Sequence, residues 1–537
     1  MSSLVRRSIG LVITLTLVLS VSAIAAPVGL ARQDTSTRVA GIDIDSTTIP
    51  ELQALMDAHR LTSVQLTQFY LRRIRQLNDE LKAVITVSPT ALFDAIAADR
   101  ARRQGDDRPL LGIPIIVKDN INTTGMPTTA GSWALAGSTP SDAFIVAQLR
   151  AAGALVIGKA NLSEWANFRS SPSSSGWSGI GGQGSMAYVL DRNPCGSSSG
   201  SGVVASADLA VAAVGTETDG SIVCPSGANS VVGIKPTVGL LSREGIVPIS
   251  ADQDTAGPMA RNVTDAAVLL GAMTGVDPAD PATAAQAGNA YTDYTQFLDL
   301  DGLEGARIGV WRQGTFGIDP DVDAIMEVTI TALVDAGATI VDPTNIPIEP
   351  AFEPEFTALL CEFKDDIAGY LETYTTAGYP KTLQALIDFN DANPDLEGPW
   401  NSLIFELAQD TDGRADPDCI AARQEANSIA QAAVDDTMTA NDLDAIIAPT
   451  NGPAWVTDPV NGDLGGDFST FVGSSTPAAV AGYANVTVPA GYVDGALPVG
   501  VSFIGGRWDE PTLIALAFSF EQATQVRVPP SFLPTLD

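Results

Sequence analysis

The sequence has only one histidine, His59, among its 537 residues. Zinc sites and the common serine-hydrolase triads both rely on histidine, as a metal ligand or as a general base. A single histidine therefore excludes multi-histidine metal chemistry. It also raises the question of which other side chain serves as the base if a serine of this chain is a nucleophile.

Cysteine and basic residues are scarce as well. The four cysteines, Cys195, Cys224, Cys361 and Cys419, contain no CxxC pair, so we expect no structural zinc site. Two disulfides, Cys195 with Cys224 and Cys361 with Cys419, are compatible with the sequence, and so are free buried thiols. The chain has 29 basic and 63 acidic residues, a net charge of −34. Such a surface repels nucleic acid and anionic lipid, so we expect neither as a partner.

Long apolar runs are missing everywhere except at the N-terminus. Residues 1–25 combine two early arginines, an apolar run over 9–21 and small residues near the end, the pattern of a cleaved secretory signal peptide. A retained membrane anchor is the alternative, although the run is short for a full span. We expect a secreted or periplasmic protein in which residues 26–40 are loose.

The rest of the chain, residues 41–537, alternates short apolar runs with helical patterns. This alternation predicts an α/β fold, and 45% hydrophobic residues are enough for a large core. We expect one domain with its catalytic core at about 83–270 and a mostly helical substrate-side region at about 350–440. The strand-like runs are 83–87, 113–117, 154–157, 231–234, 307–311, 339–341, 445–448, 486–489 and 499–504.

Two helix starts are marked by capping residues. Thr48 and Glu51 form a capping-box pattern before an amphipathic helix that would end near His59. Asp319 followed by Pro320 predicts the start of a second helix. The only histidine is therefore expected at the end of a surface helix.

Residues 170–202 are rich in glycine and serine, and composition alone indicates a flexible linker. The tract also contains Trp177, Tyr188, Asp191 and Arg192, however. It continues directly into VVASADLAVAAVG, which we expect to be a buried helix. Because a linker does not usually open a buried helix, we favour an ordered segment.

Two short motifs imitate known functional loops. GALVIGKA at 153–160 is similar to a phosphate-binding loop, but no Ser or Thr follows Lys159, and the middle of the motif is a predicted strand. GSSSG at 196–200 fits the G-x-S-x-G nucleophile elbow around Ser198, which needs a histidine later in the chain. We reject the first motif for these reasons. We reject the second because His59, the only histidine, precedes Ser198.

A third candidate nucleophile is Ser221 in GTETDGSIVCP, residues 215–225. Without a usable histidine, a neutral lysine is the obvious base. Burial can lower a lysine pKa by the roughly three units that this role requires. Lys118, Lys159 and Lys235 all accompany apolar runs, and Lys118 lies at the carboxyl end of a predicted buried strand, where α/β sheets place their sites. Spacing alone does not decide among the three.

Several stretches together resemble the amidase signature family of serine hydrolases. They are LGIPIIVKDNI, VIGKANLSEWANF, NPCGSSSGSGVVAS, VGTETDGSIVCPSGANSVVGIKPTVGL, DTAGPMARNVTDAA, PAAVAGYANVTVPAGY and LPVGVSFIGG. The resemblance extends over about 48–525 and is most specific at 195–240. GWSG and VLDRNPCGSSSGSG are most similar to the bacterial peptide amidase branch, which deamidates C-terminal peptide amides. The resemblance implies a large mixed β-sheet covered by helices on both faces.

The resemblance also implies roles for individual residues. Lys118 corresponds to the family's base, Ser197 to its bridging serine and Ser221 to its nucleophile. The implied oxyanion hole consists of the main-chain amides of Thr218, Asp219, Gly220 and Ser221. The implied reaction hydrolyses the C–N bond of a peptide amide or a similar small carboxamide through an acyl-enzyme, with no metal and no cofactor.

Two positions differ from many relatives, and two alternatives remain open. Asp219 stands where glycine is common, and Val223 stands where arginine is common, which makes small acidic amides and the glutamyl-tRNA amidotransferase role a poorer fit. A hydrolase of aryl or fatty-acid amides or esters would use the same catalytic residues. A non-catalytic scaffold protein is disfavoured because Lys118, Ser197 and Ser221 are all present.

Overall fold

The structure is a computed structural model that describes residues 36–465 and 472–536. The expected signal peptide, residues 1–25, and residues 26–35 of the expected loose segment lie outside this part. Residues 37–537 form one compact unit. It begins earlier than we expected, because strand β1 (Arg38–Val39) pairs antiparallel with β2 (Ile42–Asp43). Ala40 and Gly41 both have positive φ, which closes a two-residue hairpin turn.

One large sheet occupies the centre of this unit. Its strands are β3 (Val84–Val87), β4 (Pro114–Lys118), β5 (Leu155–Ala160), β8 (Ala212–Glu217), β9 (Val232–Lys235), β10 (Thr255–Ala260), β11 (Arg307–Val310), β12 (Thr339–Val341), β13 (Ala445–Pro449), β14 (Asn485–Val493) and β15 (Leu497–Ile504). They form an 11-stranded sheet in the order β12-β11-β13-β15-β14-β9-β10-β8-β4-β5-β3. β4 runs parallel to β5 and β8, and β11 runs parallel to β12 and β13. The other pairs are antiparallel, so the sheet is mixed.

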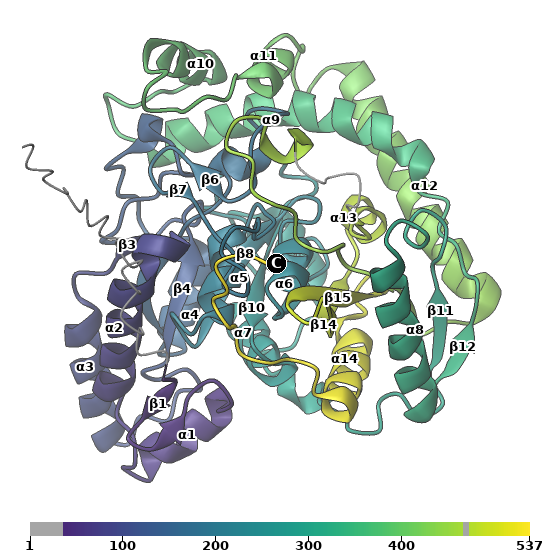
Figure 1. Ribbon diagram of the computed structural model, residues 1–537. Helices are drawn as coiled ribbons and strands as arrows, with labels where there is room; N and C mark the ends of the chain where they lie inside the picture. Colours follow the sequence, from purple (N-terminus) through teal and green to yellow (C-terminus); the bar gives the residue numbers. More distant parts are fainter. Residues whose placement is uncertain (1–35, 466–471, 537) are drawn as a thin grey trace, which may run out of the picture. The chain divides into compact units, whose positions relative to one another are not determined.

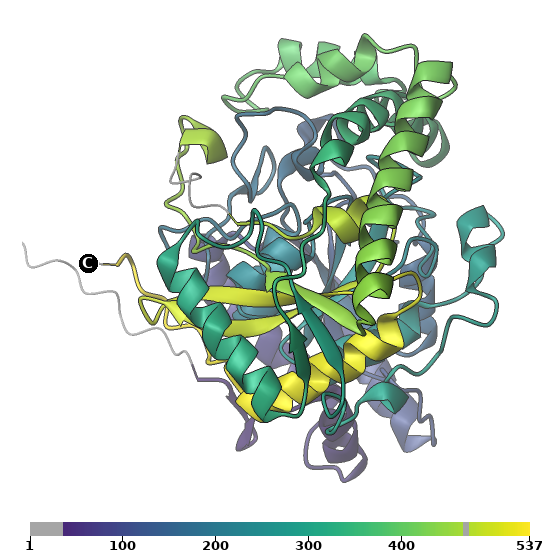
Figure 2. The ribbon, with the colours of Figure 1, turned by 90° about the vertical axis from the view of Figure 1, so that its right-hand side faces the viewer.

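Helices cover the sheet (Figure 1). They are α1 (Ile49–Asp57), α2 (Ser63–Leu81), α3 (Ala91–Arg103), α4 (Phe144–Ala151), α5 (Ser199–Ser206), α6 (Val223–Ala228), α7 (Val263–Met273), α8 (Pro320–Asp335), α9 (Phe352–Tyr374), α10 (Leu383–Ala392), α11 (Leu403–Gln409), α12 (Pro417–Asn441), α13 (Thr476–Ala481) and α14 (Glu510–Thr524). Helices α9–α12 lie together beyond one edge of the core in Figure 1, and Figure 2 shows the same group at the top. None of the helices in residues 36–465 and 472–536 has the length and apolar character needed to cross a bilayer.

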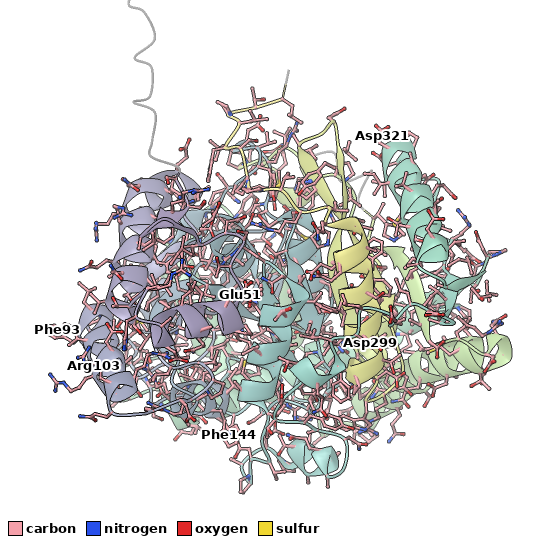
Figure 3. The ribbon with its side chains drawn as sticks, turned by 90° about the horizontal axis from the view of Figure 1, so that it is seen from below. Glu51, Phe93, Arg103, Phe144, Asp299 and Asp321 are labelled. Atoms are coloured by element: carbon pink, nitrogen blue, oxygen red, sulfur yellow. A yellow bond between two sulfur atoms is a disulfide. The ribbon has the colours of Figure 1, made fainter. Side chains whose placement is uncertain are left out.

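Both helix starts marked by capping residues are confirmed. Thr48 and Glu51 form a reciprocal capping box at α1, where Glu51 is labelled in Figure 3. Asp319 accepts hydrogen bonds from the first backbone N–H groups of α8. Helix α1 ends at Asp57, so His59 lies just beyond the helix and is exposed. It is therefore not placed as a buried base.

The expected buried helix over VVASADLAVAAVG is wrong in its second half. Helix α5 ends at Ser206, and Ala212–Glu217 is the central strand β8. Asp208 has a φ of 54°, a left-handed conformation that does not continue a helix. Small apolar residues without a clear period fit a buried helix and a buried strand equally well. The preceding Gly/Ser-rich tract is ordered as we favoured, and Ser170, Ser174 and Ser178 are buried.

Candidate active site

Lys118 is the last residue of β4, between the parallel strands β5 and β8. Its side chain is fully buried, and its Nζ lies 2.8 Å from Oγ of Ser197 and 2.9 Å from Oγ1 of Thr216. Burial lowers the pKa of Lys118 to about 7, although the negative charges of Asp254 and Glu217 act in the opposite direction. Near neutral pH this lysine can therefore be an uncharged base in contact with a serine hydroxyl.

The two competing lysines have backbone partners instead. Nζ of Lys159 donates to the carbonyl of Ile121 at 2.7 Å and lies 3.4 Å from Oδ1 of Asp119. Nζ of Lys235 donates to the carbonyl of Ala478 at 3.2 Å. Burial lowers the pKa of both lysines to about 8. Neither lysine contacts Ser197 or Ser221 within the described residues, whereas Lys118 contacts Ser197, which favours Lys118 as the candidate base.

Ser197 lies two residues before the start of α5, and its neighbour Ser198 holds the segment in place. The hydroxyl of Ser198 donates to the carbonyl of Thr216 at 2.9 Å and accepts from the Thr216 N–H at 3.1 Å. The Ser198 N–H donates to the carbonyl of Ser221 at 3.1 Å. These bonds tie the Ser197 segment to β8 and to the turn that carries Ser221. Ser198, the serine of the rejected elbow motif, has a structural role.

A disulfide connects the same two segments. Cys195 and Cys224 are bonded, with their Cα atoms 6.0 Å apart. Cys195 precedes Ser197 by two residues, and Cys224 follows Ser221 by three. The second pair that the sequence allowed, Cys361 with Cys419, is also bonded. The sequence is compatible with disulfides or with free thiols, and the structure has the disulfides. Through its bond to Cys195, Cys224 connects the Ser221 turn to the Ser197 segment.

The turn over residues 218–221 presents four consecutive main-chain N–H groups. None of the four donates to an acceptor within the residues that the structure describes. Gly220 has a φ of +79°, and a Cβ at this position would lie 3.0 Å from Oγ of Ser475. Glycine is therefore required to turn the chain here. Nearly buried N–H groups without partners are costly unless a ligand or water accepts from them, which is the property of an oxyanion hole.

The next two N–H groups have a permanent acceptor. The carboxylate of Glu217 accepts from Ile222 at 2.7 Å and from Val223 at 3.0 Å, and so caps the start of α6. Burial raises the pKa of Glu217 above its ordinary value. Along residues 218–223, the unpaired N–H donors are thus those of residues 218–221.

Asp219, the unusual residue of the turn, directs its carboxylate toward α13. Its Oδ1 accepts from the hydroxyl of Ser475 at 2.5 Å and its Oδ2 from that of Thr476 at 2.7 Å. Burial raises its pKa, while these two hydrogen bonds lower it. The side chain is held by the N-terminal end of α13, and the Asp219 N–H remains unpaired. Aspartate at this position is therefore compatible with a hole built from main-chain amides.

Ser221 itself is 8% exposed, whereas Ser197 is fully buried. Within the described residues no hydrogen bond joins the two hydroxyl groups. A cavity of about 470 Å³ borders both segments and is lined by Gly196, Gly220 and Trp455 among others. A second cavity, of about 370 Å³, is lined by Asn120, Thr216 and Thr218 among others. The 470 Å³ cavity therefore reaches the direct chain neighbours of both serines.

Comparison with known proteins identifies the family. The family model named Amidase matches residues 65–514. The chain belongs to the amidase family. A probable amidase of Arabidopsis thaliana is 39% identical over 91% of this chain and 92% of its own length. A glutamyl-tRNA(Gln) amidotransferase chain of Symbiobacterium thermophilum is 34% identical over 88% of this chain and 96% of its own.

Solved structures of amidases share the fold. The native peptide amidase of Stenotrophomonas maltophilia is 48% identical, with a TM-score of 0.86 over 91% of this chain and 99% of that chain. A peptide amidase in complex with the competitive inhibitor chymostatin has a TM-score of 0.87 at 48% identity, over 90% and 99%. These findings confirm the resemblance and the α/β fold with its large mixed sheet. The protein is an amidase, an enzyme that hydrolyses amide C–N bonds.

The sequence reasoning missed two residues that surround the amidase lysine. Oγ1 of Thr216 accepts from Lys118, and it also accepts from Nδ2 of Asn120 at 2.9 Å. Thr216 was missed because the preceding residues 203–215 were assigned to a helix and Thr216 itself to the turn that carries Ser221. On a strand, side chains alternate between the two faces, so Thr216 and Glu217 point to opposite sides of β8. The parallel pairing of β8 with β4 brings Thr216 next to the end of β4.

Proposed function

We propose that this amidase hydrolyses carboxamides through a Ser221–Ser197–Lys118 triad and a covalent acyl-enzyme. The observation that carries the proposal is the contact between Nζ of Lys118 and Oγ of Ser197 at 2.8 Å, in a fully buried site where the lysine pKa falls to about 7. A neutral amine at this place can accept a proton, whereas an ordinary protonated lysine cannot. The reaction also requires hydrogen-bond donors that stabilise the oxyanion, and the four unpaired N–H groups of residues 218–221 are suited to this.

Acylation proceeds by two coupled proton transfers. Oγ of Ser221 attacks the amide carbon and gives its proton to Oγ of Ser197, which passes its own proton to Nζ of Lys118. The carbonyl oxygen becomes an oxyanion and accepts hydrogen bonds from the main-chain amides of the 218–221 turn. Each such donor is worth about 3 kcal/mol by analogy with other oxyanion holes.

The return of the proton breaks the C–N bond. Protonated Lys118 donates through Ser197 to the leaving nitrogen, which departs as ammonia or an amine. Water then attacks the acyl-enzyme and delivers a proton along the same path, which releases the carboxylic acid and restores Ser221. Protons balance over the cycle. Apart from the substrate and water, the steps use side chains and main-chain amides of this chain.

We propose peptide amides or similar carboxamides as the substrates. The support is the 48% identity to the peptide amidase of Stenotrophomonas maltophilia, together with the 470 Å³ cavity beside Gly196 and Gly220, the chain neighbours of the two serines. Trp455 and Val223 give this cavity an apolar wall, while Asp219 and Asp463 add carboxylates. Such a lining suits a short peptide with mixed polar and apolar groups better than a long alkyl chain.

We also propose that the mature enzyme works outside the cytoplasm. The two disulfides support this location, because disulfides persist in oxidising compartments. Cell fractionation with N-terminal sequencing of the mature enzyme tests the proposal. A new N-terminus near residue 26 on the soluble enzyme is expected, whereas an intact N-terminus in the membrane fraction would indicate an anchor instead.

A substrate panel on one purified sample tests the proposed activity. The kcat/KM values for a dipeptide amide, an aryl acylamide, an aryl ester and a long-chain fatty amide are compared, with Ser221→Ala as the control for background hydrolysis. We expect the dipeptide amide to be the best amide substrate and ammonia to be released in equal amount to the new carboxylate. A higher kcat/KM for the aryl or fatty compounds would refute the peptide-amide assignment.

A further inference from the structure

Thr218, the first residue of the oxyanion turn, is held at two points by residues outside the triad. Its hydroxyl donates to Oδ1 of Asp254 at 2.6 Å, and its carbonyl accepts from Nε2 of Gln253 at 3.0 Å. The Thr218 carbonyl and the Asp219 N–H belong to the same trans peptide group, so they point in opposite directions. A bond that fixes this carbonyl therefore also fixes the direction of one unpaired N–H of the turn.

Gln253 is suited to hold the Thr218 carbonyl because both its amide nitrogen and its amide oxygen have hydrogen-bond partners. It is 1% exposed, and its Nε2 also donates to Oε1 of Glu355 at 2.7 Å. Its Oε1 accepts from Nη1 of Arg423 at 2.6 Å. A guanidinium group can only donate and a main-chain carbonyl can only accept, so the neighbours determine which end of the amide faces Thr218. Among side chains of this size, only an amide satisfies both partners.

Arg423 in turn is fixed by a paired carboxylate. Its Nε and Nη2 donate to the two carboxylate oxygens of Glu362 at 2.8 and 2.7 Å, and the hydroxyl of Ser250 donates to the same carboxylate at 2.6 Å. Arg423 and Glu362 are both nearly buried. A bidentate pair of this kind holds the guanidinium in one orientation. The position of Gln253 is therefore imposed by helices α9 and α12.

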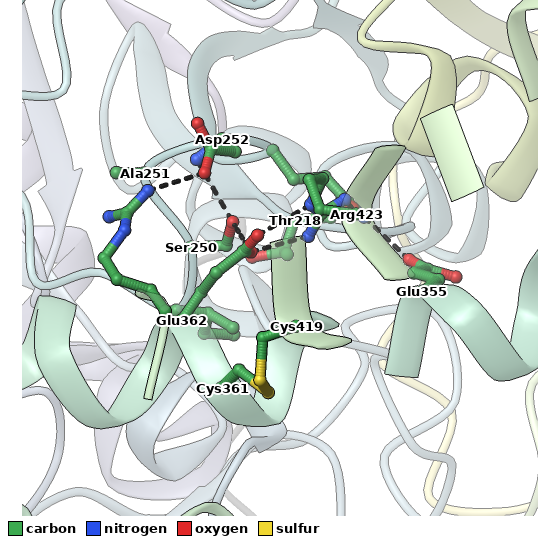
Figure 4. A network of polar contacts seen from close by, with 12 residues as sticks. Thr218, Ser250, Ala251, Asp252, Glu355, Cys361, Glu362, Cys419 and Arg423 are labelled. Carbon is green, nitrogen blue, oxygen red and sulfur yellow. Dashed lines mark hydrogen bonds and ion pairs between the residues drawn. A yellow bond between two sulfur atoms is a disulfide. The ribbon is translucent and has the colours of Figure 1, made fainter. Parts of the chain in front are cut away.

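The disulfide Cys361–Cys419 joins these two helices beside the ion pair, as Figure 4 shows. Cys361 directly precedes Glu362 on α9, and Cys419 lies four residues, about one helical turn, before Arg423 on α12. The covalent bond thus fixes the spacing of α9 and α12 at the level of Glu362 and Arg423. A continuous set of bonds runs from the helical region at 352–441 to the catalytic turn.

We propose that Gln253 is a positioning residue of the oxyanion hole, which aims the Asp219 N–H at the reacting oxygen and is itself supported by Arg423 and Glu362. The proposal rests on the proposed function, because it assumes that Ser221 attacks a carbonyl beside this turn. Gln253 touches neither the substrate nor the reacting atoms. Its loss therefore affects the charged transition state more than the bound amide.

Two substitutions separate this role from simple packing. Gln253→Leu removes both the donor and the acceptor, whereas Gln253→Glu keeps the length and the bond to Arg423 and loses the amide donor to Thr218. For both variants we expect kcat to fall at least about tenfold while KM stays within about twofold. For Gln253→Leu the acid limb of the pH profile is expected to keep its midpoint, because this substitution adds no charge near Lys118. Asn427→Ala is the matched control, since Asn427 contacts Nη1 of Arg423 at 3.3 Å without contacting Gln253.

Binding of two inhibitors provides a readout that a packing defect would not change. A peptide aldehyde forms a tetrahedral adduct with an oxyanion, whereas the matching peptide alcohol binds without one. We expect Gln253→Leu and Gln253→Glu to weaken the aldehyde by the same factor as kcat/KM and to leave the affinity of the alcohol within about twofold. Asn427→Ala is expected to behave as wild type with both inhibitors.

The outcomes distinguish this proposal from the proposed function. If the wild type reacts with a fluorophosphonate at Ser221 but the Gln253 variants keep their kcat, or lose aldehyde and alcohol binding equally, the positioning role is overturned. If the wild type itself is not labelled at Ser221, the proposed function fails. Should Gln253→Leu not fold, Gln253→Glu alone decides the question, because it retains the partner for Arg423.

Discussion

Lowering the pH switches off the proposed base, and the structure sets where this happens. Burial lowers the pKa of Lys118 from 10.5 to about 7. This shift means that the protein interior disfavours the protonated lysine by about 5 kcal/mol relative to water. At pH 7 about half of the molecules hold a neutral Lys118, against roughly one in three thousand for an ordinary lysine. The buried site therefore converts a poor base into a usable one.

The direction of the pH dependence follows from which form is active. Neutral Lys118 accepts the proton, so activity is present above the pKa and is lost as the pH falls through it. Below the midpoint, kcat/KM is expected to fall about tenfold per pH unit, to about 10% at pH 6 and about 1% at pH 5. Asp254, whose pKa burial raises to about 6, loses its charge in the same range. Since that charge favours protonated Lys118, its loss would make the limb shallower below pH 6.

The assay is the pH profile of kcat/KM from pH 4 to 9 with a neutral peptide amide, whose own charge does not change. Circular dichroism at each pH confirms that the enzyme stays folded. A rate that remains flat down to about pH 4 in a folded enzyme would refute a lysine base. A kcat/KM that still rises about tenfold per pH unit up to pH 9, as an ordinary lysine pKa of 10.5 would give, would refute the effect assigned to burial.

Two further predictions concern the other lysine and the disulfide at the site. Lys118→Met is expected to lower kcat at least about a hundredfold. Lys159→Met removes the cationic partner of Asp119, so we expect the free energy of unfolding to fall by about 3–5 kcal/mol with most activity retained. Equal activity losses in the two variants would mean that the base is wrongly assigned. Replacing both Cys195 and Cys224 by alanine is expected to lower the free energy of unfolding, measured by guanidinium titration, by about 4 kcal/mol. Free thiols detected in the unreduced wild-type enzyme would contradict the pairing.

Most of the sheet could be predicted from the sequence because its strands are short, continuous apolar runs. β4, β5, β13 and β15 each lie within a few residues of the expected runs. β8 was missed because VVASADLAVAAVG is uniformly small and apolar, so neither a helical nor a strand period is visible. The order of the strands was beyond reach, since β9, β10 and β14 meet by pairings between distant segments.

The candidate site could be proposed from the sequence only where chemistry limits the choice. A chain with one exposed histidine directs attention to lysine, and the family resemblance then selected Lys118, Ser197 and Ser221. The residues that position the oxyanion turn carry no such signal. Gln253 and Arg423 are 170 residues apart, and their contact depends on how α12 packs. Glutamine and arginine are ordinary surface residues by composition, so only the structure shows that they are buried against the catalytic turn.

Covalent labelling of Ser221 tests the central claim most directly. The wild-type enzyme is treated with a fluorophosphonate at pH 8, and the modified residue is located by peptide mapping and mass spectrometry. We expect one adduct per chain, on Ser221, with no adduct in Ser221→Ala and much slower labelling in Lys118→Met. An unlabelled wild type, or an adduct that persists in Ser221→Ala, would contradict the proposed triad.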